Sequence, residues 1–370
     1  MNNNDNIYSL AAVGVQQLIP YKAGKPIEEL ERELGLTQII KLASNENPLG
    51  PGKKALAAIQ AVLPTLALYP DGSGFALKQA LAKKYGIQES QITLGNGSNE
   101  LLELVARTFL TPEHECVFSQ HAFAVYPIVT QAIGAKALVV PALNYGHDLP
   151  AMLKAVTDKT RLVFIANPNN PTGTLLSQES VEAFLTALPE TCVCVLDEAY
   201  FEFVSSTGTI NSIAWLQQFP NLLITRTFSK AYGLAGLRVG YGLSNTGLAD
   251  LLNRVRQPFN NNTLALVAAE AALTDAEHLA QTIAVNTQGM QQLTEGFKKL
   301  ALEWIPSAGN FVLVDVKQAA QPLYDALLHK GVIVRPVGNY ELPNHLRISI
   351  GTSEENSVFL KALAETLANV

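Results

Sequence analysis

The chain has 370 residues, of which 48% are hydrophobic and 16% are charged, and its formal net charge is −6 at pH 7. That length suits a large domain with a smaller one, or two comparable domains. No apolar stretch is long enough to cross a membrane, and residues 1–5 lack the basic and apolar blocks of a signal peptide. The acidic balance, with no basic block, argues against nucleic acid as a partner.

The three cysteines are Cys116, Cys192 and Cys194. Cys192 and Cys194 alternate within an apolar run, so we expect them on one face of a strand, in the core and unbridged. An odd, sparse set of cysteines suits a reducing cytoplasm. The six histidines are scattered, with no His-x-x-x-His or Cys-x-x-Cys pair, so we predict no metal site.

Residues 1–45 are expected to form an N-terminal arm with one amphipathic helix at residues 27–34, ending in a turn-rich loop. From residue 52 helices alternate with short apolar strands. The predicted helices are 53–62, 74–84, one starting near 101, 125–133 and 180–188, and the predicted strands are 92–94, 116–118, 137–140, 162–166, 191–196 and 222–224. This pattern predicts an α/β large domain at residues 46–250, with a mostly parallel sheet between helices.

The pattern changes after residue 245. Long helices are predicted at 248–256 and 263–298, and strands at 310–316, 332–334 and 346–350 with a helix at 322–330. These segments predict a smaller α+β domain at residues 251–370, joined to the first by a long helix.

Reactive side chains follow the predicted strands at their carboxyl ends, the edge where ligands bind in open α/β sheets. Gly-Asn-Gly-Ser-Asn at residues 95–99 opens a helix and suits a phosphate, although an ordinary tight turn explains it equally well. Asn-Pro-Asn-Asn-Pro-Thr-Gly at residues 167–173 is a rigid turn whose asparagine amides suit a flat ligand.

Asp197 closes an apolar strand, so its carboxylate needs a partner, either a helix end or a protonated ring nitrogen. Tyr200 adds a phenol nearby. Lys230 follows the next strand in an apolar, glycine-rich stretch, where loss of water favours a neutral, nucleophilic amine; the alternative is a lysine in a surface loop. These groups, with hydroxyls and an arginine around Lys230, complement the aldehyde, ring and phosphate of pyridoxal 5′-phosphate.

On these motifs the chain resembles the fold-type I pyridoxal-phosphate aminotransferases over nearly its whole length. Within that family it is most similar to the histidinol-phosphate aminotransferases, through Pro-Tyr-Lys-Ala-Gly-Lys-Pro at 20–26, Leu-Ala-Ser-Asn-Glu-Asn-Pro at 42–48, Tyr-Pro-Asp-Gly at 69–72 and Leu-Arg-Ile-Ser-Ile-Gly-Thr at 346–352. The resemblance implies the fold-type I architecture and pyridoxal 5′-phosphate as the cofactor.

The resemblance also implies a role for each matching residue. Lys230 would hold the cofactor as a Schiff base and move the proton between Cα and C4′, and Asp197 would keep the pyridine nitrogen protonated. The other implied cofactor contacts are Gly97, Ser98, Asn99, Thr227, Ser229 and Arg238 at the phosphate, Asn170 and Tyr200 at the 3′ oxygen, and Phe123 stacked on the ring. Phe123 departs from the tyrosine usual in this subfamily, but phenylalanine also stacks. Tyr69 would reach the phosphate from the other subunit, which implies a homodimer.

For the substrates, the resemblance implies that Arg347 clamps the carboxylate of glutamate or 2-oxoglutarate. Arg335, with Tyr21 and Asn45, would bind the phosphate of histidinol phosphate. The predicted reaction is ping-pong transamination of histidinol phosphate with 2-oxoglutarate, giving imidazole-acetol phosphate and glutamate, in histidine biosynthesis.

Three alternatives stay open on the sequence alone. An aromatic amino-acid aminotransferase of the same family would use a similar flat pocket, and a phosphoamino-acid decarboxylase is a more distant possibility. A non-catalytic regulatory protein on this fold is disfavoured, because the arm before the first motif is short and not basic.

Overall fold

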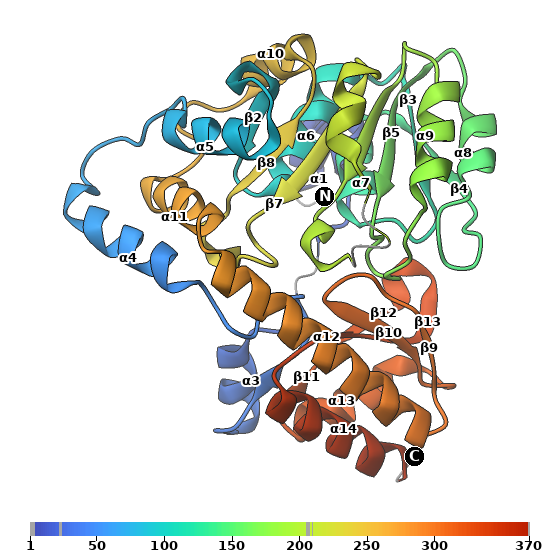
Figure 1. Ribbon diagram of the computed structural model, residues 1–370. Coiled ribbons are helices and arrows are strands. Elements are labelled where there is room, and N and C mark those ends of the chain that lie inside the picture. Colours follow the sequence, from blue (N-terminus) through green and yellow to red (C-terminus); the bar gives the residue numbers. More distant parts are fainter. Residues whose placement is uncertain (1–3, 22–23, 205–207, 209, 369–370) are drawn as a thin grey trace.

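The computed structural model describes residues 4–21, 24–204, 208 and 210–368. A seven-stranded sheet in the order β2-β8-β7-β6-β5-β3-β4 occupies the upper part of Figure 1. Its strands are β2 (Ile92–Gly95), β3 (Glu115–Ser119), β4 (Lys136–Val140), β5 (Thr160–Ala166), β6 (Val193–Asp197), β7 (Leu222–Thr227) and β8 (Gly240–Leu243). Among the described strands of this sheet, β8 runs against the common direction: it pairs antiparallel with β2 and β7, and the other pairs are parallel, which confirms the mostly parallel α/β prediction.

Helices cover both faces of this sheet, because its strands are apolar on both sides. The side chains of Val193 and Val195 pack into a core with α6 (Ser98–Phe109), α7 (Val125–Ile133) and α10 (Thr246–Val255). Cys192, Cys194 and Leu196 pack into the opposite core, which confirms that the two cysteines share one buried face. That core also contains α4 (Lys53–Val62), α5 (Phe75–Tyr85), α8 (Leu149–Ala155), α9 (Gln178–Ala187) and α11 (Thr263–Leu273).

A second, antiparallel sheet lies in the lower part of Figure 1, in the order β12-β13-β10-β9. Its strands are β9 (Glu303–Ile305), β10 (Phe311–Asp315), β12 (Arg335–Val337) and β13 (Leu342–Ser349). The apolar side chains of β10 and β13 form a core with α12 (Ala276–Lys299), α13 (Ala320–His329) and α14 (Ser353–Leu367). The long helix α12 crosses in front of the molecule between the two parts (Figure 1).

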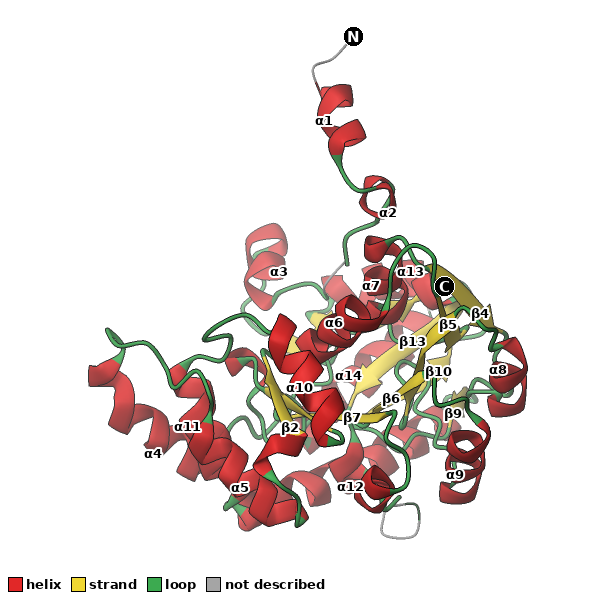
Figure 2. Cartoon of the chain, turned by 90° about the horizontal axis from the view of Figure 1, so that it is seen from above, coloured by secondary structure: helices red, strands yellow, loops and turns green. Residues whose placement is uncertain are grey.

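The N-terminal segment contains more structure than the single predicted helix. Besides α3 (Ile27–Leu34), it forms α1 (Asn4–Leu10) and α2 (Val13–Gln16), which project from the body of the molecule in Figure 2. The short strand β1 (Ile40–Lys41) pairs in parallel with β11 (Val332–Ile333), and Leu30 packs against Ala43 and Ile333. Lys22 and Ala23 of the arm motif lie outside the described residues.

Three sequence expectations were wrong in detail. The predicted helix 263–298 is two helices, because Thr274 and Asp275 interrupt it with side chains that favour helix ends. The helix predicted from Leu101 begins at Ser98, directly after Gly97 at φ +77°. The structure also contains β1, β8, β9, β12, α8 and α14, which were not predicted. β8 is short and glycine-rich, and α14 carries a capping box of Thr352 and Glu355 that would have marked its start.

Candidate active site

One cavity of about 200 Å³ lies at the carboxyl ends of β5, β6 and β7. Because β6 pairs with β5 on one side and β7 on the other, the motifs that follow these strands come together. All the predicted site residues line the cavity except Gly97 and Tyr69. Those lining it are Tyr21, Asn45, Ser98, Asn99, Phe123, Asn170, Asp197, Tyr200, Thr227, Ser229, Lys230, Arg238, Arg335 and Arg347.

Lys230 follows β7 and points into the cavity. Its Nζ donates to the carbonyl oxygen of Ser44 at 3.1 Å and lies 5.9 Å from the centre of the Tyr200 ring. Burial, with the nearby positive charge of Arg347 as the next cause, lowers the pKa of Lys230 from 10.5 to about 8. A substantial fraction of the amine is therefore neutral near physiological pH and able to attack a carbonyl.

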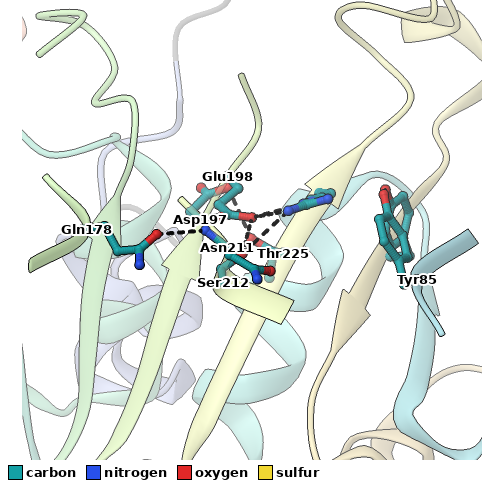
Figure 3. Close-up of polar contacts among 9 residues, drawn as sticks. Tyr85, Gln178, Asp197, Glu198, Asn211, Ser212 and Thr225 are labelled. Carbon is teal, nitrogen blue, oxygen red and sulfur yellow. Dashed lines mark hydrogen bonds and ion pairs between the residues drawn. The ribbon is translucent and has the colours of Figure 1, made fainter. Parts of the chain in front are cut away.

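Asp197 is the last residue of β6 and is buried. Its Oδ1 accepts from Thr225 Oγ1 at 3.0 Å, and its Oδ2 accepts from Tyr126 Oη at 2.9 Å. Figure 3 shows Thr225 beside Asp197, and the two are directly paired between β6 and β7. Burial raises the pKa of Asp197, while the hydrogen bonds from Tyr126 and Thr225 act in the opposite direction.

Sequence reasoning missed both partners of Asp197. A signal for Thr225 was present, because it lies two residues before Thr227 and so faces the same side of β7. Tyr126 carried no comparable signal: it lies three residues after Phe123 at the start of α7, and only packing brings its hydroxyl to Asp197.

Tyr200 is the centre of a buried hydrogen-bond network. Its hydroxyl oxygen accepts from Asn45 Nδ2 at 2.9 Å and from Asn170 Nδ2 at 3.1 Å, which leaves its own hydrogen available to another acceptor. Burial raises the pKa of Tyr200 to about 12, so the phenol stays neutral. Asn170 Oδ1 in turn accepts from Arg347 Nη1 at 2.6 Å, and this contact joins the small sheet to the turn after β5.

A cluster of donors lies at the N-terminus of α6. Ser98 and Asn99 form its first turn, and Thr227, Ser229 and Arg238 face it across the cavity. Arg238 Nη1 lies 3.4 Å from Ser229 Oγ, and Thr227 Oγ1 lies 3.0 Å from the same oxygen. Hydroxyls, helix amides and a guanidinium form the donor set that binds a phosphate.

Gly97 does not line the cavity, but the donor cluster depends on it. Its φ is +77°, and a Cβ at this position would lie 2.5 Å from Arg238 Nη2. Only glycine therefore allows the Arg238 guanidinium to lie against the start of α6.

Arg335 and Arg347 lie side by side on the small sheet. They are direct partners in the β12–β13 pairing, so both face the cavity from the same side of the sheet. The Arg335 guanidinium carbon lies 5.8 Å from the centre of the Tyr21 ring. Arg347 is buried, and its Nε has no hydrogen-bond partner within the described part of the chain. Two adjacent cations with an unsatisfied buried donor make this wall a site for an anion.

Tyr69 and His121 both lie outside the cavity. Tyr69 is 84% exposed and stacks on Phe259 with ring centres 4.8 Å apart. The Nδ1 of His121 lies 2.7 Å from the Tyr340 carbonyl oxygen. Phe123 lines the cavity as predicted and packs edge-on against Tyr126.

Within residues 4–21, 24–204, 208 and 210–368, no helix combines the length and apolarity needed to span a membrane. In the same part of the chain, no three His, Cys, Asp or Glu side chains are grouped so that they could hold a metal ion.

The sequence pattern of the family described as Aminotransferase class I and II matches residues 37–363. The chain belongs to the class I and II aminotransferases. It is 60% identical over 362 residues to histidinol-phosphate aminotransferase 2 of Pseudomonas fluorescens strain Pf-5, covering 97% of this chain and 98% of the relative. It is 57% identical to histidinol-phosphate aminotransferase 1 of Idiomarina loihiensis, covering 97% and 98% of the two chains.

Solved aminotransferases share the fold. The histidinol-phosphate aminotransferase of Sinorhizobium meliloti, solved in complex with pyridoxal-5′-phosphate, superposes with a TM-score of 0.91 at 32% identity, over 98% of each chain. The aspartate aminotransferase of Thermus thermophilus with maleate, at 21% identity, superposes with a TM-score of 0.82 over 97% of this chain and 98% of that one. The chain is therefore an enzyme of the aminotransferase class, with the α/β architecture that its sequence predicted.

Proposed function

We propose that this aminotransferase uses pyridoxal 5′-phosphate to transfer the amino group of histidinol phosphate to 2-oxoglutarate, giving imidazole-acetol phosphate and glutamate in histidine biosynthesis. One observation carries the proposal: a single cavity contains Lys230, Asp197, a phosphate-binding donor cluster and the paired arginines Arg335 and Arg347. The names of the relatives at 55–60% identity support the choice of substrate.

The residues present fit the cofactor. The donor cluster of Ser98, Asn99, Thr227, Ser229 and Arg238 suits its phosphate, and the space left at Gly97 keeps that cluster open. Phe123 would stack on the ring, Asp197 would pair with the ring nitrogen, and the free hydrogen of Tyr200, with Asn170, would serve the 3′ oxygen. When bound, the cofactor supplies an aldehyde that takes up amines and a ring that withdraws electrons from the substrate Cα.

Lys230 would supply the amine that holds the cofactor and, when free, the base for the proton on the substrate Cα. Its lowered pKa, about 8, suits both tasks near neutral pH. Tyr200 stays protonated and would donate to the ring's 3′ oxygen, while the bonds from Asn45 and Asn170 fix the position of the Tyr200 oxygen.

The paired arginines would distinguish the two substrates. Arg347 presents a buried guanidinium that suits the carboxylate shared by glutamate and 2-oxoglutarate. Arg335, with Tyr21 and Asn45, would bind the phosphate of histidinol phosphate, and in the other half-reaction the same pair would serve a dicarboxylate.

The substrate is tested by comparing kcat/KM for histidinol phosphate and for phenylalanine with 2-oxoglutarate as acceptor. We expect a preference for histidinol phosphate. A preference for phenylalanine would contradict the substrate and favour an aromatic amino-acid aminotransferase, while leaving the cofactor chemistry intact.

We further propose a homodimer in which Tyr69 serves the phosphate site of the partner subunit. Supporting it, Tyr69 lies away from its own cavity, amid exposed apolar side chains of the same region: Leu56, Leu63, Leu66, Leu68 and Phe75. Mixing Tyr69→Ala and Lys230→Ala subunits tests this, because each mixed dimer would regain one of its two sites. A fully exchanged equimolar mixture, in which about half of the dimers are mixed, would then show about a quarter of the wild-type activity. No regain of activity in verified mixed dimers would contradict a role across the interface.

Two finer assignments belong to the same proposal. The first divides the chain into an arm (1–45), a large domain (46–250) and a small domain (251–370). Because α10 packs on α6, and α11 packs on α4 and α5, these two helices belong with the large domain, which favours a boundary between the two domains nearer α12. We place the enzyme in the cytoplasm, since its three cysteines are buried free thiols.

A further inference from the structure

Tyr126 has no role in the proposed mechanism, yet its hydroxyl donates to the carboxylate of Asp197. The side chain is fully buried, and its ring stacks face to face on Phe164 with centres 4.4 Å apart and planes 2° apart. This stacking fixes the direction of the ring, and the hydroxyl reaches Asp197 Oδ2 at 2.9 Å. Tyr126 itself does not line the cavity.

Asp197 therefore receives one hydroxyl donor on each oxygen, from Tyr126 on Oδ2 and from Thr225 on Oδ1. An ionised carboxylate accepts both bonds and, with the backbone amide of Ala199 as a third donor, still has an acceptor position left for one more. A protonated carboxyl group would bring its own hydrogen toward one of these donors, so the arrangement favours the ionised form. The two bonds also fix the plane of the carboxylate.

The neighbouring titratable groups are compatible with this role. Burial, and then the charge of Asp197, raises the pKa of Tyr126 well above 10, so its hydroxyl remains a donor. Tyr200 and Tyr340, the other titratable groups acting on Tyr126, also have raised pKa values through burial.

The remaining charge beside Asp197 is Glu198, the next residue in the chain. Glu198 bonds to Ser212 at 3.0 Å (Figure 3) and forms a buried ion pair with Arg226 at 2.8 Å. The charge of the Glu198 carboxylate is thus compensated by Arg226, while Tyr126 and Thr225 donate to Asp197.

We propose that Tyr126 and Thr225 are positioning residues for the cofactor's ring nitrogen, which act through Asp197 by holding its carboxylate ionised and in one plane. The inference rests on the proposed function, which pairs that nitrogen with Asp197. Without the Tyr126 hydroxyl, the carboxylate becomes more basic and draws the shared proton away from the ring. A less protonated ring would withdraw electrons less strongly. The pKa of the Lys230 nitrogen joined to the cofactor would therefore rise.

The test is Tyr126→Phe, which removes the hydroxyl and keeps the ring stacked on Phe164. With the cofactor-loaded enzyme, we expect the pH midpoint of the cofactor's absorbance change to rise by about one unit, as the loss of a hydrogen bond to a charged group predicts. We expect kcat to fall about tenfold and KM for both substrates to stay within about twofold, because Tyr126 does not reach the cavity.

Tyr85→Phe is the matched control. It removes the hydroxyl of a half-buried tyrosine, which is bonded to Tyr241 Oη at 2.6 Å and lies outside the cavity. We expect its midpoint to equal that of the wild type. Thr225→Val removes the other donor and is expected to shift the midpoint in the same direction, which keeps the test open if Tyr126→Phe does not fold.

Unchanged midpoints in folded Tyr126→Phe and Thr225→Val enzymes would overturn the inference, as would an equal shift in Tyr85→Phe. Failure of the proposed function is distinguishable. In that case the wild-type enzyme itself would show no pH-dependent cofactor absorbance, and borohydride would attach no cofactor to Lys230.

Discussion

The cofactor side and the substrate side of the cavity differ in how far apart their residues lie along the chain. On the cofactor side, Asp197 and Lys230 extend from β6 and β7, neighbouring strands that pair directly at Asp197 and Thr225. On the substrate side, Tyr21 from the arm meets Arg335 and Arg347 from the small sheet, more than 300 residues away.

This difference separates chemistry from substrate choice. The position of Lys230 relative to Asp197 is fixed by backbone hydrogen bonds within one sheet, so it resists change elsewhere. The position of Arg335 and Arg347 depends on how the small sheet and the arm pack against that sheet. Substitutions on the substrate side should therefore change the substrate preference. Substitutions on the cofactor side should lower the activity toward every substrate.

The largest effect is expected from Lys230→Ala. Loss of the attaching amine and of the base should lower kcat by about 10⁴-fold for both substrates, the upper end for a general base. Borohydride reduction followed by peptide mapping should label Lys230 in the wild type and nothing at this position in the variant. Lys84→Met is the control, because desolvation also lowers the pKa of Lys84, but this lysine lies outside the cavity. Full turnover in Lys230→Ala would refute the mechanism.

Arg347→Lys should change substrate binding and leave the cofactor side of the cavity unaffected. A single ammonium cannot reproduce the paired bonds of a guanidinium, so KM for glutamate should rise about 10- to 100-fold, in the range for hydrogen bonds to charged groups. The pH midpoint of the bound cofactor should stay within the wild-type error. Arg335→Lys should instead reduce kcat/KM for histidinol phosphate more than for glutamate. Equal losses of kcat/KM for both substrates in both variants would show that the two arginines do not bind different substrates.

Gly97→Ala should weaken the cofactor site without touching the substrate side. A Cβ at φ +77° is strained and would push on Arg238 Nη2 at 2.5 Å, so we expect cofactor affinity to fall about 5- to 30-fold. Equilibrium dialysis of the apoenzyme measures this. Gly35→Ala is the matched control, because its φ is +67° but no atom lies within 4 Å of the added Cβ. An affinity equal to that of the wild type would mean that Arg238 does not hold the phosphate.

The smallest effect concerns pH. Because the pKa of Lys230 is lowered to about 8, its amine becomes neutral at lower pH than an ordinary lysine with a pKa of 10.5. The rate at which apoenzyme combines with pyridoxal 5′-phosphate should rise about tenfold from pH 7 to 9 and then level off, as titration of one group predicts. A rate that kept rising steeply to pH 10 would show an unperturbed lysine.

Local patterns were sufficient for the cofactor side. Short apolar strands have to be buried on both faces, which makes the sheet parallel and brings the residues after β5, β6 and β7 to one edge. Asp197, Asn170 and Lys230 could be assigned on that basis, and the bounds of α3, α4 and α7 were predicted as observed. The break at Thr274 and the start of α14 were missed although their capping residues are visible in the sequence.

Some features of the site depend on packing between segments that carry no shared pattern. No spacing rule connects Tyr126 with Asp197, because their contact depends on how α7 lies on the sheet and on the stacking of Tyr126 against Phe164. The pairing of Arg335 with Arg347 likewise follows from the register of β12 and β13, which includes an irregularity after Pro336.

The sequence by itself determined the α/β class, the order of the cofactor motifs and the choice of Lys230 as the candidate reactive lysine, because each depends on hydrophobic periodicity or on a short motif at a strand end. The tertiary structure decided which partners surround Asp197, how Gly97 makes room for Arg238 and where the two arginines face. These depend on distances of a few ångströms between residues far apart in the chain, and only close packing of the folded protein sets such distances.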